Sequence, residues 1–245
     1  MNMDQAELPS HAIYRQVREN VIGLLTERAD AAGRGVPACP GWTVGDLVHH
    51  LVGICARVIG RLSGQGQSQG QGQAQAHGPA PEAAPSGESD LAKLLIRWAE
   101  LGECLDRLSV EVALPRGHIL AMDAFTHELD LRSTLKLPPP AGHPGYPGML
   151  AVVIDGLSEE VVGRGLPSLR IELPGAHWIA GRDRRPAATV WAPGPHDLYR
   201  TLTGRRTCAQ ITALSWSADP APWLPAFAWG PFSPPARPAE EPVGC

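Results

Sequence analysis

The sequence predicts an α plus α+β fold, in which a four-helix bundle over residues 1–140 precedes a small α+β domain over residues 149–232. Before the proline run at 138–140, apolar residues recur at helical spacing in four segments. After it, short segments alternate apolar and polar residues as strands do. Residues 63–89 are rich in Gly, Gln, Pro and Ala and contain no large apolar residue, so we expect a disordered loop between the second and third helices.

The first two helices are predicted by apolar stripes and by start signals. Ser10 is a candidate cap for a helix over residues 14–32, which Gly33 and the following glycines and prolines end. Thr43 and Asp46 have the spacing of a capping box, so a second helix begins there. Its apolar stripe comprises Val44, Leu47, Val48, Leu51, Cys55, Val58, Ile59 and Leu62.

The third and fourth helices complete the predicted bundle. Ser89 or Asp90 caps the third, and the fourth spans residues 117–135 until Pro138 stops it. The stripe of the third helix comprises Leu91, Leu94, Leu95, Trp98, Leu101, Leu105 and Leu108.

The second half of the chain has a different pattern. Residues 169–173 and 188–192 are expected to be strands, residues 196–202 a short helix, and residues 209–217 a third strand. The proline-rich end, residues 233–245, is expected to be a flexible tail.

Composition excludes several classes of protein. The net charge of −4 gives no support for a nucleic-acid partner. No apolar run approaches the roughly 20 residues that span a bilayer, and the first residues lack the pattern of a signal peptide, so we expect a cytoplasmic protein that does not contact membranes. The five cysteines include no CxxC pair, which favours reduced, buried thiols. Only two Lys and two Asn occur, which suggests a G+C-rich genome.

Asp123 and His127 on the fourth helix lie one turn apart and can bind a common cation. His49 and His50 on the second helix are candidates for a third ligand. They point about 100° apart, and His50 lies beside the apolar stripe that faces the bundle. Three such ligands leave one position of a tetrahedral zinc open, as in catalytic sites. Spacing alone also permits ordinary hydrogen-bonded histidines.

Residues 36–51, VPACPGWTVGDLVHHL, resemble the "CPGWTVxDLVxHL" segment of the mycothiol-dependent maleylpyruvate isomerase family. The resemblance implies a DinB-like four-helix bundle in which His50 binds the metal. It assigns the other two ligands to Asp123 and His127, where the family has Glu in the first of these positions. With the shorter Asp, the helices approach more closely, a water intervenes or metal affinity falls. Asp130 is then a candidate partner of His127, with a surface salt bridge as the alternative.

Residues 194–206 resemble a "GPxxDLxxxLxGRR" segment of the same family. The resemblance implies an actinobacterial enzyme in which zinc activates mycothiol for isomerisation of, or transfer to, a small electrophilic substrate. Arg205 and Arg206 are candidate catalytic residues that bind a carboxylate. The alternative for this pair is a helix end at which cations offset the dipole.

Two other functions fit the same residues. One is a metal-binding bundle without turnover, with a ligand-binding or regulatory function. The other is a structural bundle without a metal.

Overall fold

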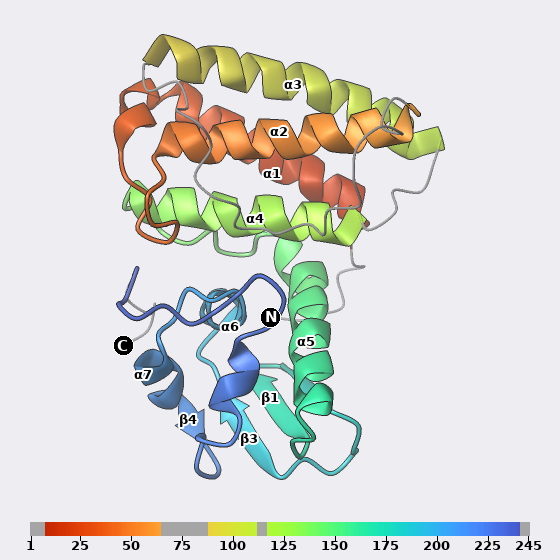
Figure 1. The fold of residues 1–245 in the computed structure, drawn as a ribbon, viewed down its shortest axis with the longest axis vertical. Coiled ribbons are helices and arrows are strands. Elements are labelled where there is room, and N and C mark those ends of the chain that lie inside the picture. Colours follow the sequence, from red (N-terminus) through yellow and green to blue (C-terminus); the bar gives the residue numbers. More distant parts are fainter. Residues whose placement is uncertain (1–7, 65–87, 112–116, 241–245) are drawn as a thin grey trace. The chain divides into compact units, whose positions relative to one another are not determined.

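The computed structural model describes residues 8–64, 88–111 and 117–240 (Figure 1). The chain divides into two compact units, Pro9–Pro139 and a second unit made of Met1–Leu8 with Pro140–Cys245. The described part is mostly helical, with one small mixed sheet in the second unit. The predicted fold class, a four-helix bundle followed by a small α+β unit, is confirmed. Most of the loop expected at 63–89 lies outside the described residues.

The first unit consists of the four long helices and one short 3-10 turn. These elements are α1 (Ser10–Thr26), η1 (Ala29–Gly33), α2 (Val44–Leu62), α3 (Glu88–Glu111) and α4 (Gly117–Thr134). Helix α1 packs against α3 and α4, and α2 packs mainly against α3 (Figure 1).

The first helix differs from its expected bounds of 14–32. Ser10 is the first helical residue rather than the cap, and the cap position is Pro9, whose carbonyl accepts hydrogen bonds from the first turn. At the other end, Arg28 leaves the helical region with φ −138° and ψ 44°, so α1 stops at Thr26 and η1 follows. In contrast, the capping box predicted for α2 is present: Asp46 N–H donates to Thr43 Oγ1 at 3.2 Å, and Thr43 N–H donates to Asp46 Oδ2 at 2.8 Å.

The bundle core contains most residues of the predicted stripes and a fourth helix that is buried on nearly all sides. Five stripe residues are only half-buried: Val58, Ile59, Leu62, Leu94 and Leu108. Trp98 is fully buried and donates its indole N–H to the hydroxyl of Tyr14 at 2.9 Å. In α4, every residue from 120 to 131 except Asp123 is buried. This buried stretch includes the polar side chains Thr126, His127, Glu128 and Asp130. Buried polar groups require hydrogen-bond or ionic partners, so this polar cluster marks α4 as the helix of a candidate functional site.

The second unit begins with a helix and three strands. These are α5 (Gly145–Gly163), β1 (Leu169–Leu173), β2 (Ala176–Ala180) and β3 (Ala188–Trp191). The sheet order is β2-β1-β3-β4, with β1 antiparallel to β2 and parallel to β3. Alternate residues of β1 are buried, as the predicted strand pattern requires. Helix α5 packs against β2.

The remaining elements are α6 (Pro195–Leu202), α7 (Cys208–Thr212), β4 (Ser215–Trp216) and η2 (Leu224–Phe227). The strand predicted at 209–217 is therefore wrong over most of its length. A capping box starts α7 instead: Gln210 N–H donates to Thr207 Oγ1 at 3.1 Å, and Thr207 N–H donates to Gln210 Oε1 at 2.9 Å. Only Ser215 and Trp216 pair with β3.

Among the described residues, no helix is both long enough and apolar enough to cross a membrane.

Candidate metal centre

The structure brings together the three predicted ligands. His50 on α2 and the Asp123/His127 pair on α4 offer donor atoms that all lie within 4.8 Å of one another. His50 Nε2 is 3.4 Å from Asp123 Oδ2, and His127 Nε2 is 3.7 Å from Asp123 Oδ1. The neighbouring His49 is exposed, so the two adjacent histidines of α2 do point in different directions.

These separations suit a small divalent cation. Zinc binds nitrogen and oxygen at about 2.0–2.2 Å, so neighbouring ligand atoms in a tetrahedral site lie about 3.3–3.6 Å apart. The distances from Asp123 to both imidazoles are close to that range. One carboxylate oxygen of Asp123 thus lies at a ligand-to-ligand distance from His50, and the other oxygen lies slightly farther from His127.

His50 Nε2 provides a second test of whether these three residues suit a metal ion. This atom is buried and has no hydrogen-bond partner among the described residues. A buried polar atom without a partner costs about 1–3 kcal/mol. A cation at this position would satisfy it.

His127 contacts a different carboxylate through its other nitrogen. Its Nδ1 lies 3.0 Å from Asp130 Oδ2, and Cys39 Sγ lies 3.9 Å from the same nitrogen. Burial lowers the pKa of His127, but the bonds with Asp130 and Cys39 and the charge of Asp123 outweigh it and raise the pKa to about 10. The ring thus sits between two carboxylates, with Nδ1 toward Asp130 and Nε2 toward Asp123. A carboxylate on the far nitrogen is the usual support for a metal-binding histidine.

Residues 14–132 match the family model described as mycothiol maleylpyruvate isomerase N-terminal domain. The bundle belongs to this family. The match extends from Tyr14 in α1 to Arg132 in α4, includes all three candidate ligands and ends before the second unit. The family suggests a mycothiol-related, metal-binding function for the bundle. No curated protein and no solved structure gives a match.

Two residues of this family domain, Cys39 and Trp42, belong to the site although they were not predicted as members of it. The Trp42 ring centroid lies 5.1 Å from that of His50 and 6.3 Å from that of His127, nearly parallel to the latter. The sequence signal for both residues is their position in the 36–51 segment, which carries the family resemblance. Trp42 also lines an open hollow of about 500 Å³ formed with residues 33–43.

The candidate catalytic residues Arg205 and Arg206 lie in the second unit, outside the family match, and both are buried. Arg206 donates to Asp197 at 2.9 Å and to Glu240 at 2.5 Å. Arg205 donates to the Thr203 carbonyl at 2.6 Å and lies over the Phe232 ring, 5.8 Å from its centroid.

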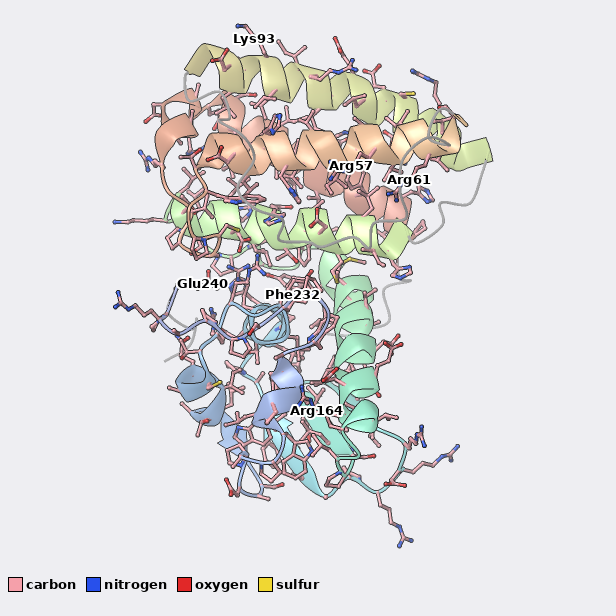
Figure 2. All side chains as sticks on the ribbon, in the orientation of Figure 1. Arg57, Arg61, Lys93, Arg164, Phe232 and Glu240 are labelled. Atoms are coloured by element: carbon pink, nitrogen blue, oxygen red, sulfur yellow. The ribbon has the colours of Figure 1, made fainter. Side chains whose placement is uncertain are left out.

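Glu240 belongs to the segment expected to be a flexible tail, of which the structure describes residues 233–240. Besides Arg206, it accepts from Arg200 at 2.6 and 3.0 Å, and these guanidiniums lower its pKa to about 2 even though burial raises it. Figure 2 labels Glu240 on this segment and Phe232 just before it. An acidic residue within a proline-rich end therefore pairs with two buried arginines, which composition alone does not indicate.

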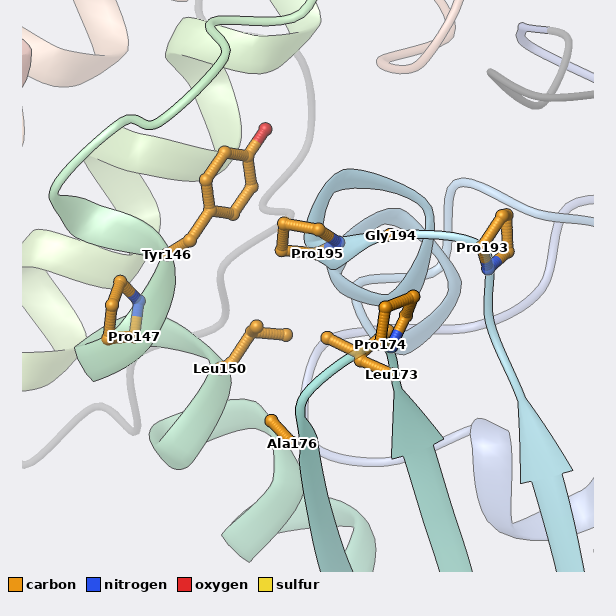
Figure 3. A pocket seen from close by; sticks show the side chains of 9 residues that line it. All are labelled: Tyr146, Pro147, Leu150, Leu173, Pro174, Ala176, Pro193, Gly194 and Pro195. Carbon is orange, nitrogen blue, oxygen red and sulfur yellow. The ribbon is translucent and has the colours of Figure 1, made fainter. Parts of the chain in front are cut away.

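A small pocket of about 150 Å³ also lies in the second unit (Figure 3). Four prolines form much of its wall: Pro147, Pro174, Pro193 and Pro195. Its lining has one titratable side chain, Tyr146, whose hydroxyl lies 2.9 Å from His196 Nδ1. With one titratable side chain in its lining, this apolar pocket offers less acid–base chemistry than the bundle site.

Proposed function

We propose that the chain is a zinc-dependent, mycothiol-using enzyme of the maleylpyruvate isomerase type. It would activate the thiol for isomerisation of, or transfer to, a small electrophilic substrate. The family match supports the thiol. The metal is supported by the convergence of His50, Asp123 and His127, and by His50 Nε2, which has no hydrogen-bond partner among the described residues. The proposal includes an actinobacterial source, because mycothiol is a thiol of actinobacteria. It also includes a cytoplasmic location.

The side chains of this site have separate tasks. His50, Asp123 and His127 would hold the cation, and three protein ligands leave a fourth position for the thiol. A zinc ion held there would lower the pKa of the thiol and so supply a nucleophile near neutral pH. Asp130 holds His127 through Nδ1, and Trp42 lies nearly parallel to the His127 ring and tilted against the His50 ring.

Arg205 and Arg206 are our candidates for binding a substrate carboxylate. Arg206 already donates to Glu240, so a substrate at Arg206 would have to displace that carboxylate. The proposal for these arginines therefore requires the last segment of the chain to move.

Turnover by the metal-loaded protein tests the proposal. Purified protein with one zinc per chain is incubated with mycothiol and maleylpyruvate, and both isomerisation and thiol consumption are followed. His50→Ala should lose metal and activity, whereas the matched variant His49→Ala changes an exposed neighbour and should keep both.

The controls separate the three functions. Loss of metal in His49→Ala but not in His50→Ala would contradict the ligand assignment. No acceleration by fully loaded wild type would favour the alternative, a metal-binding bundle with a ligand-binding or regulatory function. Failure of the wild type to bind zinc would leave the structural bundle.

A further inference from the structure

We propose that Cys39 is a positioning residue of the metal centre, whose thiol acts with Asp130 to fix the ring of His127. This inference rests on the proposed function, because it assumes a cation at His50, Asp123 and His127. It adds a residue from the loop between η1 and α2 to a site otherwise built on two helices.

Cys39, His127 and Asp130 form a closed group of three contacts. Cys39 Sγ donates to Asp130 Oδ2 at 3.6 Å and lies 3.9 Å from His127 Nδ1, and that nitrogen lies 3.0 Å from the same carboxylate oxygen. All three residues are buried, at 7%, 2% and 0% exposure in the order Cys39, His127 and Asp130. At this depth bulk water does not compete for the contacts, so each partner restrains the other two.

The loop that carries Cys39 is itself fixed by backbone hydrogen bonds. Cys39 N–H donates to the Val36 carbonyl at 2.9 Å, and Trp42 N–H donates to the Cys39 carbonyl at 3.0 Å. Val44 N–H, at the start of α2, donates to the Arg34 carbonyl at 2.9 Å. The thiol is therefore held relative to α2, the helix that carries His50.

This placement joins the two halves of the ligand set. The Asp130 carboxylate that receives the thiol and the ring that it restrains both belong to α4. Cys39 thus connects the loop leading into α2 with the helix that supplies Asp123 and His127. The contact of the Cys39 thiol with His127 and Asp130 keeps Nδ1 of His127 toward Asp130. It leaves Nε2 of the same ring toward Asp123 and His50.

Cys39, His127 and Asp130 could also be taken as a metal-binding group of their own, because their donor atoms lie within the same 4.8 Å limit. Their contacts favour positioning instead. Asp130 Oδ2 already accepts from the thiol and faces His127 Nδ1. In the other group, His50 Nε2 is buried and has no hydrogen-bond partner among the described residues.

The hydrogen bond, rather than the volume of Cys39, is what the proposal requires. Serine keeps a donor at position 39, valine fills the space without a donor, and alanine does neither. We expect Cys39→Val and Cys39→Ala to weaken zinc binding by about tenfold, the lower end of the cost of losing an outer contact of a metal ligand. Cys39→Ser should stay within about threefold of wild type.

The experiment measures zinc affinity by competition with a chelator of known affinity for wild type and the three variants. Cys55→Ser and Cys55→Val are the matched controls, because Cys55 is also a buried thiol of the bundle but lies beside Tyr14 instead of the site. Circular dichroism and melting of the zinc-free proteins check the fold. The ¹⁵N resonances of His127 report the ring without any need for turnover, and they should change in Cys39→Val but not in Cys39→Ser.

Each outcome decides a different point. Wild type without zinc affinity sinks the proposed function itself. Zinc-binding wild type with an equal affinity in Cys39→Val and an unchanged His127 spectrum overturns the positioning function alone. Complete loss of zinc in all three Cys39 variants, with retention in Asp123→Ala, shows that Cys39 is a ligand and also overturns it. If Cys39→Val does not fold, the comparison of serine with alanine decides.

Discussion

The carboxylate of Asp123 lies between two imidazoles and approaches both, although it is one methylene shorter than the glutamate of the family pattern. Its two oxygens are 3.4 Å from His50 Nε2 and 3.7 Å from His127 Nε2. These distances are close to those between neighbouring ligands of one zinc ion, about 3.3–3.6 Å. The substitution is thus compatible with a cation in the same place.

Removal of the Asp123 carboxylate tests whether this side chain binds the cation. We expect Asp123→Ala to weaken zinc binding more than about 100-fold, because loss of a mere outer contact already costs roughly 10- to 100-fold. Asp123→Glu should stay within about tenfold of wild type, since it keeps the charge and the donor type. Chelator competition measures both, and Asp90→Ala, which removes a surface carboxylate paired with Lys93, is the control. Wild-type affinity in Asp123→Ala would remove it from the ligand set.

His196 is a residue whose burial should appear in the pH dependence of stability. Burial, and then the nearby charge of Arg200, lowers its pKa from 6.5 to about 4. Between these values the unfolded chain binds a proton that the folded chain does not. The contribution of His196 to stability is therefore complete above pH 6.5 and is lost as the pH falls toward 4.

We expect the melting temperature of the wild type to fall over this window, and His196→Gln to flatten the fall. Glutamine does not titrate and can still accept a hydrogen bond from the Tyr146 hydroxyl, so the contact seen at 2.9 Å can be kept. Glu240 acts at lower pH, because its pKa moves from 4.5 to about 2 and its contribution is lost below pH 4.5. An unchanged slope between pH 6.5 and 4.5 in His196→Gln would show that another group titrates there.

At the scale of elements, the sequence predicts a helix boundary correctly where a few neighbouring residues determine it. The Thr43/Asp46 capping box gave the start of α2 correctly because capping depends on four consecutive residues. The strand predicted at 209–217 failed for the same reason, since Thr207 and Gln210 form a second capping box that was not recognised. Strand β2 was also missed, although Pro174 and Gly175 before it are a turn signal and Gly175 has φ +83°.

Helix α5 was missed although its sequence carries a helical signal. Its buried apolar side chains, Tyr146, Met149, Leu150, Val153, Ile154, Leu157 and Val161, recur at spacings of three and four. Pro147 and the glycines at 145 and 148 interrupt the pattern at its start, where proline is in fact tolerated in a first turn.

The capping box of α2 should have a measurable effect on stability. Thr43→Ala removes the acceptor of Asp46 N–H, and we expect the free energy of unfolding to fall by about 1–2 kcal/mol. Thr43→Ser keeps the hydroxyl and should recover most of this. Thr26→Ala is the control, because the exposed Thr26 hydroxyl donates back to the Ile22 carbonyl of its own helix and is not at a cap position. Urea denaturation compares the three, and equal stabilities of Thr43→Ala and Thr26→Ala would contradict the prediction.

At the scale of the whole molecule, the candidate site was predictable in part. The helical spacing of Asp123 and His127 and the inward face of His50 are periodic properties of single helices, so the sequence indicates them. That the two helices meet, and that Cys39 and Trp42 approach the same imidazoles, depends on how a loop packs on α4. The partners of Arg206 were likewise hidden, because Glu240 is 34 residues away in the chain.

Two groups of residues that belong to different compact units should give two independent stability responses of the chain. The metal ligands belong to Pro9–Pro139, and His196 belongs to the unit that contains Pro140–Cys245. Zinc binds the folded state, so at 100 times its dissociation constant it should stabilise wild type by about 2.7 kcal/mol, and excess chelator should remove this gain. Asp123→Ala should lose the zinc response but keep the fall in melting temperature between pH 6.5 and 4, measured with chelator present. His196→Gln should do the reverse, because we expect substitutions in separate compact units to act additively. Calorimetry of wild type, both single variants and the double variant measures the coupling, and a zinc response that changes in His196→Gln would show that the two groups are linked.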